Sequence, residues 1–205
     1  MKKHQFHKLC EGLTVHLPGF TVGGWLLIQA IDHGILRGFS CDPSEFDPDK
    51  FALVAFALPL FVPTRHVHFN FGFRLKDAGN RDRWWSLAES DLVTALLETI
   101  RSQGLPFLAG YNTPGQFANS FQNSGNEVDP YLREAVGFSH ANHGDFSAAL
   151  ASLASLAESL EAGIPWHAPI RSRVDLLADR IKTSQATVRH QLDATIVESR
   201  LNLGL

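Results

Sequence analysis

The chain has 205 residues, of which 44% are hydrophobic and 19% are charged, and its formal net charge at pH 7 is −3. This composition predicts a folded protein with a buried core, organised as one domain or as one domain with a sizeable appendage. The acidic balance argues against a dedicated nucleic-acid binder, because such a protein gains most of its affinity by neutralising phosphates.

The N-terminal segment carries no predicted targeting signal. Its sequence, MKKHQFHKLCEGLTV, is basic at the start but lacks the continuous apolar stretch of a signal peptide, and residues 4–17 have the spacing of a short amphipathic helix. The longest apolar run, residues 51–62, contains a proline and is too short to cross a bilayer. Cys10 and Cys41 form no CxxC motif and no zinc-binding spacing, which favours free thiols in a reducing compartment. We therefore expect a cytoplasmic protein without a membrane segment.

Strand patterns begin near residue 23. Residues 23–44 are typical of two strands joined by a tight turn at Asp32-His33-Gly34, because glycine tolerates a positive φ. Residues 51–63 are apolar on both faces, which predicts a strand that is central in its sheet or covered on both sides. Pro59 cannot donate a ladder hydrogen bond, so a bulge or an unpaired position is expected there.

The clearest strand pattern covers residues 66–75, HVHFNFGFRL. Apolar and polar side chains alternate over the whole stretch, which predicts one strand with one buried face. Three phenylalanines lie on the apolar face, and burying each is worth ~2 kcal/mol. Together, these four strands predict an antiparallel meander.

Helical spacing follows from residue 86. A leucine-rich helix around residues 92–100 is expected to stop at Gly104-Leu105-Pro106, and Thr113-Pro114 and Asp129-Pro130 each provide an N-cap followed by a proline. Residues 123–129, NSGNEVD, have the composition of a loop and provide the best internal boundary. The predicted organisation is an α+β domain over residues 1–122 and a helical region over 130–205, either separate or integrated with the first.

The C-terminal half is predicted to be entirely helical. Residues 131–162 form two helices around a break at His143-Gly144-Asp145, where Gly144 suits the C-cap of the first helix and Asp145 the N-cap of the second. Small and packing residues are placed as in a tetratricopeptide-like helical hairpin. Only one such unit is found, so a solenoid is not expected. Two further helices are predicted near 169–182 and 184–200. The fold class is therefore α+β, with an antiparallel sheet of about four strands followed by an all-helical half.

His66 and His68 would share one face of the predicted strand 66–75. Two histidines spaced by two can bind one metal ion, but a third ligand is needed, and none follows at a suitable spacing. A plain polar face, exposed to solvent or covered by helices, is the favoured explanation of the pair. A metal-dependent enzyme using His66 and His68 is one alternative function.

The stretch RDRWWSL, residues 81–87, contains two adjacent tryptophans. Neighbouring side chains diverge, so one of Trp84 and Trp85 is expected to pack while the other covers a surface or meets a partner. Tryptophan and arginine are enriched in protein-interface hot spots, which makes Arg81, Arg83, Trp84 and Trp85 candidates for protein binding. The favoured interpretation of the pair is nevertheless that both rings lie at the edge of the core and close the end of a sheet.

Residues 176–192, LLADRIKTSQATVRHQL, have the outline of a DNA-binding helix-turn-helix, with Lys182 and Arg189 as candidate nucleic-acid contacts. Residues 166–205 contain six Arg and Lys against four Asp and Glu, a weak balance for binding phosphates. Lys182 stands at the usual turn glycine, and the apolar residues of the stretch can pack on the preceding hairpin. Nucleic-acid binding is therefore the second alternative, behind packing.

No motif in the sequence predicts catalysis. There is no GxSxG elbow, no P-loop, no GxGxxG and no reactive-cysteine motif. We therefore expect no catalytic residue and no cofactor.

Four short motifs resemble an uncharacterised bacterial family that is catalogued as a domain of unknown function. They are Pro59-Leu60-Phe61-Val62-Pro63, Gly72-Phe73-Arg74-Leu75, Trp84-Trp85 and Leu105-Pro106-Phe107-Leu108. The resemblance covers about residues 10–120 and implies a short helix, a few strands and a leucine-rich helix. It carries over no catalytic residue, and it weakly links the chain to bacterial immunity and defence proteins. Because no catalytic motif is found, and because Trp84, Trp85 and the helical hairpin offer contact surfaces, the expected function is a non-catalytic protein-binding module with a protein partner.

Overall fold

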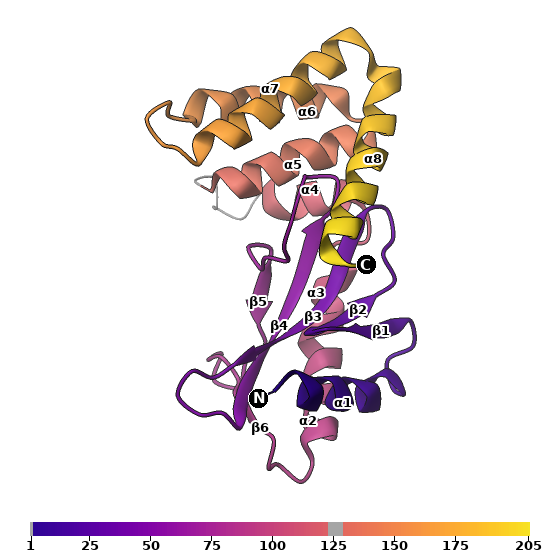
Figure 1. The fold of residues 1–205 in the computed structure, drawn as a ribbon, viewed down its shortest axis with the longest axis vertical. Helices are drawn as coiled ribbons and strands as arrows, with labels where there is room; N and C mark the ends of the chain where they lie inside the picture. The colour runs from indigo at the N-terminus through magenta and orange to yellow at the C-terminus, as the bar shows by residue number, and fades with distance from the viewer. Residues whose placement is uncertain (1, 123–128) are drawn as a thin grey trace. The chain divides into compact units, whose positions relative to one another are not determined.

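The structure is a computed structural model that describes residues 2–122 and 129–205. It confirms the α+β class, with an antiparallel sheet in the N-terminal half and helices in the C-terminal half (Figure 1). Contacts divide the chain into two compact units. Unit 1 comprises residues 1–32, 36–58 and 71–110, and unit 2 comprises residues 33–35, 59–70 and 111–205. None of the described helices combines the length and apolar character needed to span a bilayer.

Unit 1 is built on a sheet with six strands among the described residues. Strands β1 to β4 follow one another in sequence order, and β5 and β6 both pair with β4. Their bounds are β1 Phe20–Gly23, β2 Leu26–Gln29, β3 Ile35–Pro43, β4 Lys50–Pro59, β5 Gly72–Arg74 and β6 Trp85–Ser86. The apolar strand β4 therefore lies inside the sheet, as predicted, and Pro59 is its last residue. The predicted turn between β2 and β3 is also confirmed, with positive φ at His33 and Gly34.

The core of unit 1 lies between one face of the sheet and two helices, α1 (Lys3–Thr14) and α2 (Leu92–Thr99). Alternate residues of the central strands, such as Phe39 in β3 and Phe51 in β4, are fully buried against them. Each buried phenylalanine contributes ~2 kcal/mol to folding. The same alternation sends the intervening side chains of β3 and β4 to the opposite face of the sheet.

The predicted strand over residues 66–75 is wrong for most of its length, because only Gly72–Arg74 forms a strand. Its partner strand explains the difference. β4 pairs with β5 at residues 54–56, and Ala57 donates a backbone hydrogen bond to Phe71. β4 then ends at Pro59, so residues before Phe71 have no strand to pair with. Phe69 is 40% exposed as a result, whereas Phe71 and Leu75 are buried.

The predicted helix end at Gly104-Leu105-Pro106 is also wrong. After α2 the chain continues through a π-helical turn, η1 (Ile100–Gly104), into α3 (Leu105–Ala109). Proline fits the first turn of a helical segment, where its missing N–H leaves no bond unmade. Gly104 has an ordinary helical φ of −69°, and a Cβ there would lie 2.7 Å from Phe39 Cζ. This glycine allows a close helix–sheet contact and does not cap a helix.

Unit 2 is helical, with α4 to α8 in chain order. Their bounds are α4 Pro114–Gln122, α5 Pro130–His143, α6 Phe146–Ser159, α7 His167–Thr183 and α8 Gln185–Leu203. Helices α5, α6 and α7 lie side by side, and α8 runs at a steep angle to α7 (Figure 1). Most of the loop predicted at 123–129 lies outside the described residues.

The predicted helical hairpin is formed by α5 and α6. The Asp129 carboxylate accepts a hydrogen bond from the Tyr131 N–H at 2.9 Å and caps α5, and Asp145 caps α6 through the Ala148 N–H at 3.0 Å. Gly144 ends α5 with a φ of 89°. Inside the hairpin, Gly137 faces Leu153 so closely that a Cβ would meet the leucine at 2.8 Å. A small residue is therefore required there, as the sequence predicted.

The hairpin also holds a buried ion pair that the sequence did not reveal. Glu134 on α5 is 1% exposed and accepts two hydrogen bonds from Arg173 on α7, at 2.6 and 2.8 Å. Burial raises the pKa of Glu134, and the guanidinium of Arg173 opposes that rise. This pair fixes α7 against the hairpin.

Candidate functional site

The tryptophan pair lies beside β4, where Trp85 pairs with Phe51. Trp85 is fully buried, and its ring stacks on Phe51 with centroids 6.0 Å apart. The Arg83 guanidinium lies 5.1 Å from the centroid of the Trp85 ring and donates a hydrogen bond to Thr99 Oγ1 at 2.9 Å. Trp85 therefore belongs to the interior of unit 1, and the half-buried Arg83 is engaged with Trp85 and Thr99.

Trp84 lies on the other side of the chain and is 42% exposed. The guanidinium of Arg74, on β5, lies 5.6 Å from the centroid of its ring. This cation–π contact holds the indole while leaving much of its surface open to solvent. Trp85 is therefore packed in the interior, whereas Trp84 lies at the surface.

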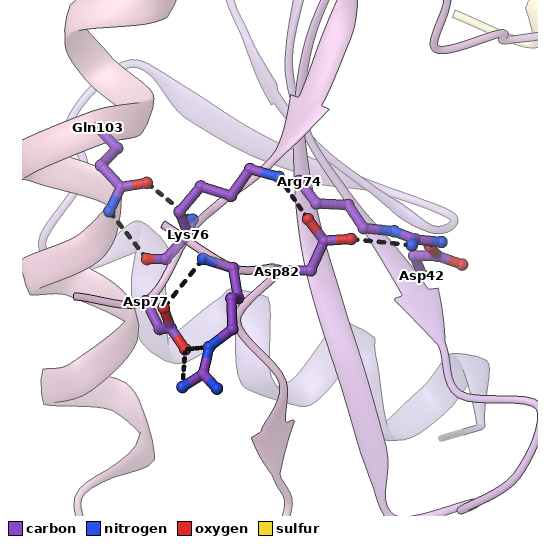
Figure 2. Close-up of polar contacts among 7 residues, drawn as sticks. Asp42, Arg74, Lys76, Asp77, Asp82 and Gln103 are labelled. Atoms are coloured by element: carbon purple, nitrogen blue, oxygen red, sulfur yellow. Dashed lines mark hydrogen bonds and ion pairs between the residues drawn. The ribbon is translucent and has the colours of Figure 1, made fainter. Parts of the chain in front are cut away.

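Arg74 is itself held by two carboxylates. Its guanidinium donates to Asp42 of β3, with Nε at 2.7 Å, and to Asp82 at 3.1 Å. Asp82 also pairs with the Lys76 ammonium at 2.5 Å. These contacts link four side chains in the order Asp42, Arg74, Asp82 and Lys76 (Figure 2). We call Asp42, Arg74, Lys76, Asp82 and Trp84 the Trp84 surface.

The backbone behind this surface is anchored at Lys76. The Gln103 side-chain amide accepts from the Lys76 N–H at 2.8 Å and donates to the Lys76 carbonyl at 2.9 Å (Figure 2). The adjoining turn is closed by Asp77, which accepts from the N–H groups of Gly79 and Arg81 at 2.8 and 3.0 Å. The Arg81 side chain is 83% exposed and pairs with Asp77 at 3.2 Å. The connection from β5 to Trp84 is therefore preorganised.

The electrostatics of this surface suit binding better than proton transfer. Hydrogen bonds from Lys76 and then Arg74 lower the pKa of Asp82, and backbone N–H donors, first that of Arg81, lower the pKa of Asp77. Carboxylates with lowered pKa values are weak general bases at neutral pH. Arg74 and Lys76 balance Asp42 and Asp82 on the Trp84 surface, and Arg81 balances Asp77 in the adjoining turn, so neither group of side chains carries a net charge.

His66 and His68 lie in the non-strand segment of unit 2, with ring centroids 6.5 Å apart and nearly perpendicular rings. Burial, and then the charge of His66, lower the pKa of His68. Across residues 2–122 and 129–205, no group of three His, Cys, Asp or Glu side chains could hold a metal ion. The pair therefore gains no third ligand from the described part of the chain.

Lys182 and Arg189 lie on either side of the junction between α7 and α8. Lys182 is exposed in the last turn of α7, whereas Arg189 donates to the Asn142 carbonyl at 3.2 Å and pairs with Asp193 at 3.2 Å. Val188 and Leu192 on α8 are buried. One of the two candidate cations is thus engaged within unit 2, and the apolar face of residues 176–192 packs.

The thiols of Cys10 and Cys41 are buried in the core of unit 1. Burial raises the pKa of each to about 12. Because the thiolate is the nucleophile, neither cysteine is suited to catalysis at neutral pH.

Sequence reasoning missed the residues that hold Trp84 in place, namely Asp42, Arg74, Lys76 and Asp82. Arg74 was part of a recognised motif, but its two carboxylate partners lie 32 and 8 residues away. Only strand pairing brings them together. Comparisons with protein-family models, with curated proteins and with solved structures found no match.

Proposed function

We propose that the chain is a non-catalytic protein-binding module, and that the Trp84 surface contacts its partner. The observation that carries this proposal is an indole left 42% exposed at the end of an ordered ion-pair network. A solvent-facing tryptophan beside an arginine is the composition of an interface hot spot. We further propose that the module acts in the bacterial cytoplasm, in an immunity- or defence-type role.

The order of this surface favours tight binding. Two carboxylates hold Arg74, and the amide of Gln103 holds the backbone of Lys76. Side chains that are already fixed lose little conformational entropy when they bind, about 0.5–1.5 kcal/mol less for each side chain. Trp84 adds a large apolar area that becomes desolvated at the centre of an interface.

The test is affinity purification of the full chain from its native host, with nuclease treatment and mass spectrometry. Trp84→Ala should reduce recovery of a stoichiometric protein partner by at least about tenfold, the effect of losing one hot-spot residue. Trp166→Ala is the matched control, because Trp166 is 44% exposed but lies on unit 2. Equal recovery with both variants, or no partner with the wild type, would overturn the proposal.

A further inference from the structure

A second exposed aromatic side chain lies in unit 1, on the segment that joins β3 to β4. Phe46 is 96% exposed. Its ring makes no contact with another aromatic ring among the described residues, whereas Phe39 and Phe51 on the flanking strands are fully buried. Water therefore surrounds a large apolar side chain that the core of unit 1 does not use.

Hydrogen bonds hold the backbone that displays this ring. The Ser44 hydroxyl accepts from the N–H groups of Phe46 and Asp47, each at 3.2 Å. Asp47 Oδ1 accepts from the Asp49 N–H at 3.0 Å, and the Ser44 N–H donates to the Lys50 carbonyl at 2.9 Å. Phe46 consequently projects from a closed, hydrogen-bonded tip, which we call the Phe46 tip (Ser44–Lys50).

The charges beside Phe46 determine which kinds of surface the tip can bind. Glu45, Asp47 and Asp49 supply three carboxylates, and Lys50 supplies one ammonium, which pairs with Asp47 at 3.3 Å. Glu45 and Asp49 have no ion-pair partner among the described residues. An acidic tip is repelled by nucleic acid and by anionic lipid, and it is attracted to a surface that carries lysine and arginine.

The tip and the Trp84 surface are joined through the same strand pairing. β6, which follows Trp84 directly, pairs with Lys50 and Phe51, and the Leu87 N–H donates to the Asp49 carbonyl at 2.9 Å. Both features belong to unit 1. The two features are therefore linked within one compact unit, and this placement favours contact with a single partner.

We propose that Phe46 inserts into an apolar pocket rimmed by lysine or arginine on the protein partner, with Glu45 and Asp49 facing that basic rim. The inference rests on the proposed function and specifies the chemistry of the partner. Burying one phenylalanine ring is enough to strengthen binding by at least about tenfold. The flanking carboxylates provide specificity and speed association at low salt.

Site-specific photo-crosslinking in the full chain tests the contact. A benzophenone amino acid replaces Phe46 in one variant, Trp84 in a second and Leu201 in a third, and each is irradiated in cleared lysate of the native host. Leu201 is the control, because it is 73% exposed but lies in unit 2. We expect position 46 to crosslink one protein, at a peptide that combines apolar residues with lysine or arginine, and position 201 not to crosslink it.

Binding of the crosslinked protein, purified, to the full chain then measures the contribution of each group. Phe46→Ser should weaken binding by at least about tenfold without changing thermal stability, and Leu201→Ser should have no effect. The double variant Glu45→Gln, Asp49→Asn should reduce the dependence of affinity on salt between about 50 and 300 mM NaCl. An unchanged affinity for Phe46→Ser, or an unchanged salt dependence, would overturn the inference.

The crosslinks also separate this inference from the proposed function. Adducts from position 84 without adducts from position 46 overturn the inference and leave the proposed function standing. Adducts from neither position overturn both. An adduct between position 46 and a second copy of the chain, or an acidic peptide, also overturns the inference.

Discussion

At the scale of single residues, Gly104 shows how one missing side chain sets a helix against a sheet. A Cβ at this position would lie 2.7 Å from Phe39 Cζ, and Phe39 is fully buried. Gly104→Ala should therefore destabilise the protein by about 1–3 kcal/mol, measured by urea unfolding. Gly12→Ala on α1 is the control, since its added Cβ meets nothing within 4 Å beyond the adjoining residues and backbone of its own helix, and it should stabilise by up to ~1 kcal/mol. Equal effects of the two substitutions would contradict this packing.

Asp82 gives a residue-scale prediction about pH. Its pKa in the folded protein is lowered, first by Lys76 and then by Arg74. Its ion pairs therefore stabilise the fold above the unfolded pKa of about 3.9, and this contribution is lost as the pH falls through the lower folded value. The difference in urea midpoint between wild type and Asp82→Asn should be full at pH 5–7 and should shrink below about pH 4.

Glu158→Gln provides the control for this experiment, because Glu158 is exposed and has no ion pair among the described residues. Its urea midpoint should follow that of the wild type at every pH. A difference between wild type and Asp82→Asn that stays constant down to pH 2.5 would show that the Asp82 carboxylate makes no stabilising ion pair.

At the scale of secondary-structure elements, the caps of the hairpin contribute local stability. The Asp145 carboxylate accepts from the Ala148 N–H at 3.0 Å at the start of α6. Asp145→Ala should cost about 1 kcal/mol of unfolding free energy, whereas Asp145→Asn keeps an acceptor and should cost less. Urea unfolding of both variants measures the difference, and two variants as stable as the wild type would show that the cap is not needed.

Local chemistry explains which elements the sequence could predict. The turn at His33-Gly34, the central strand β4 and the caps of α5 and α6 depend on residues that are close in sequence, and all were predicted. The prediction of a strand over residues 66–71 was wrong, because the alternation of apolar and polar residues does not reveal where the partner strand ends. The helix through Pro106 was missed because the role of Gly104 depends on Phe39, 65 residues away.

The same reasoning applies to the candidate site. Because adjacent side chains diverge, the sequence raised the hypothesis that one of Trp84 and Trp85 is packed and the other exposed, behind the favoured interpretation that both rings close the end of a sheet. It could not predict which, because that choice depends on the pairing of Trp85 with Phe51. It also offered no sign that Arg83 would bond to Thr99 in the interior or that Arg74 would support Trp84.

At the scale of the whole molecule, the chain contributes to each compact unit from several separate segments. Residues 59–70 belong to the same unit as the C-terminal helices, and within it the Thr64 N–H donates to Ser199 Oγ at 3.4 Å. Sequence composition cannot show that two segments far apart in the chain belong to the same compact unit. The division into residues 1–122 and 130–205 stays a prediction.

The claim that the molecule is a protein-binding module is tested most directly by native mass spectrometry of the chain, isolated gently at its natural expression level. We predict that its mass exceeds that of the single chain by the mass of one other protein, and that Trp84→Ala returns it to the mass of the single chain. A wild-type protein found only as a single chain, or only as copies of itself, would contradict the proposed function.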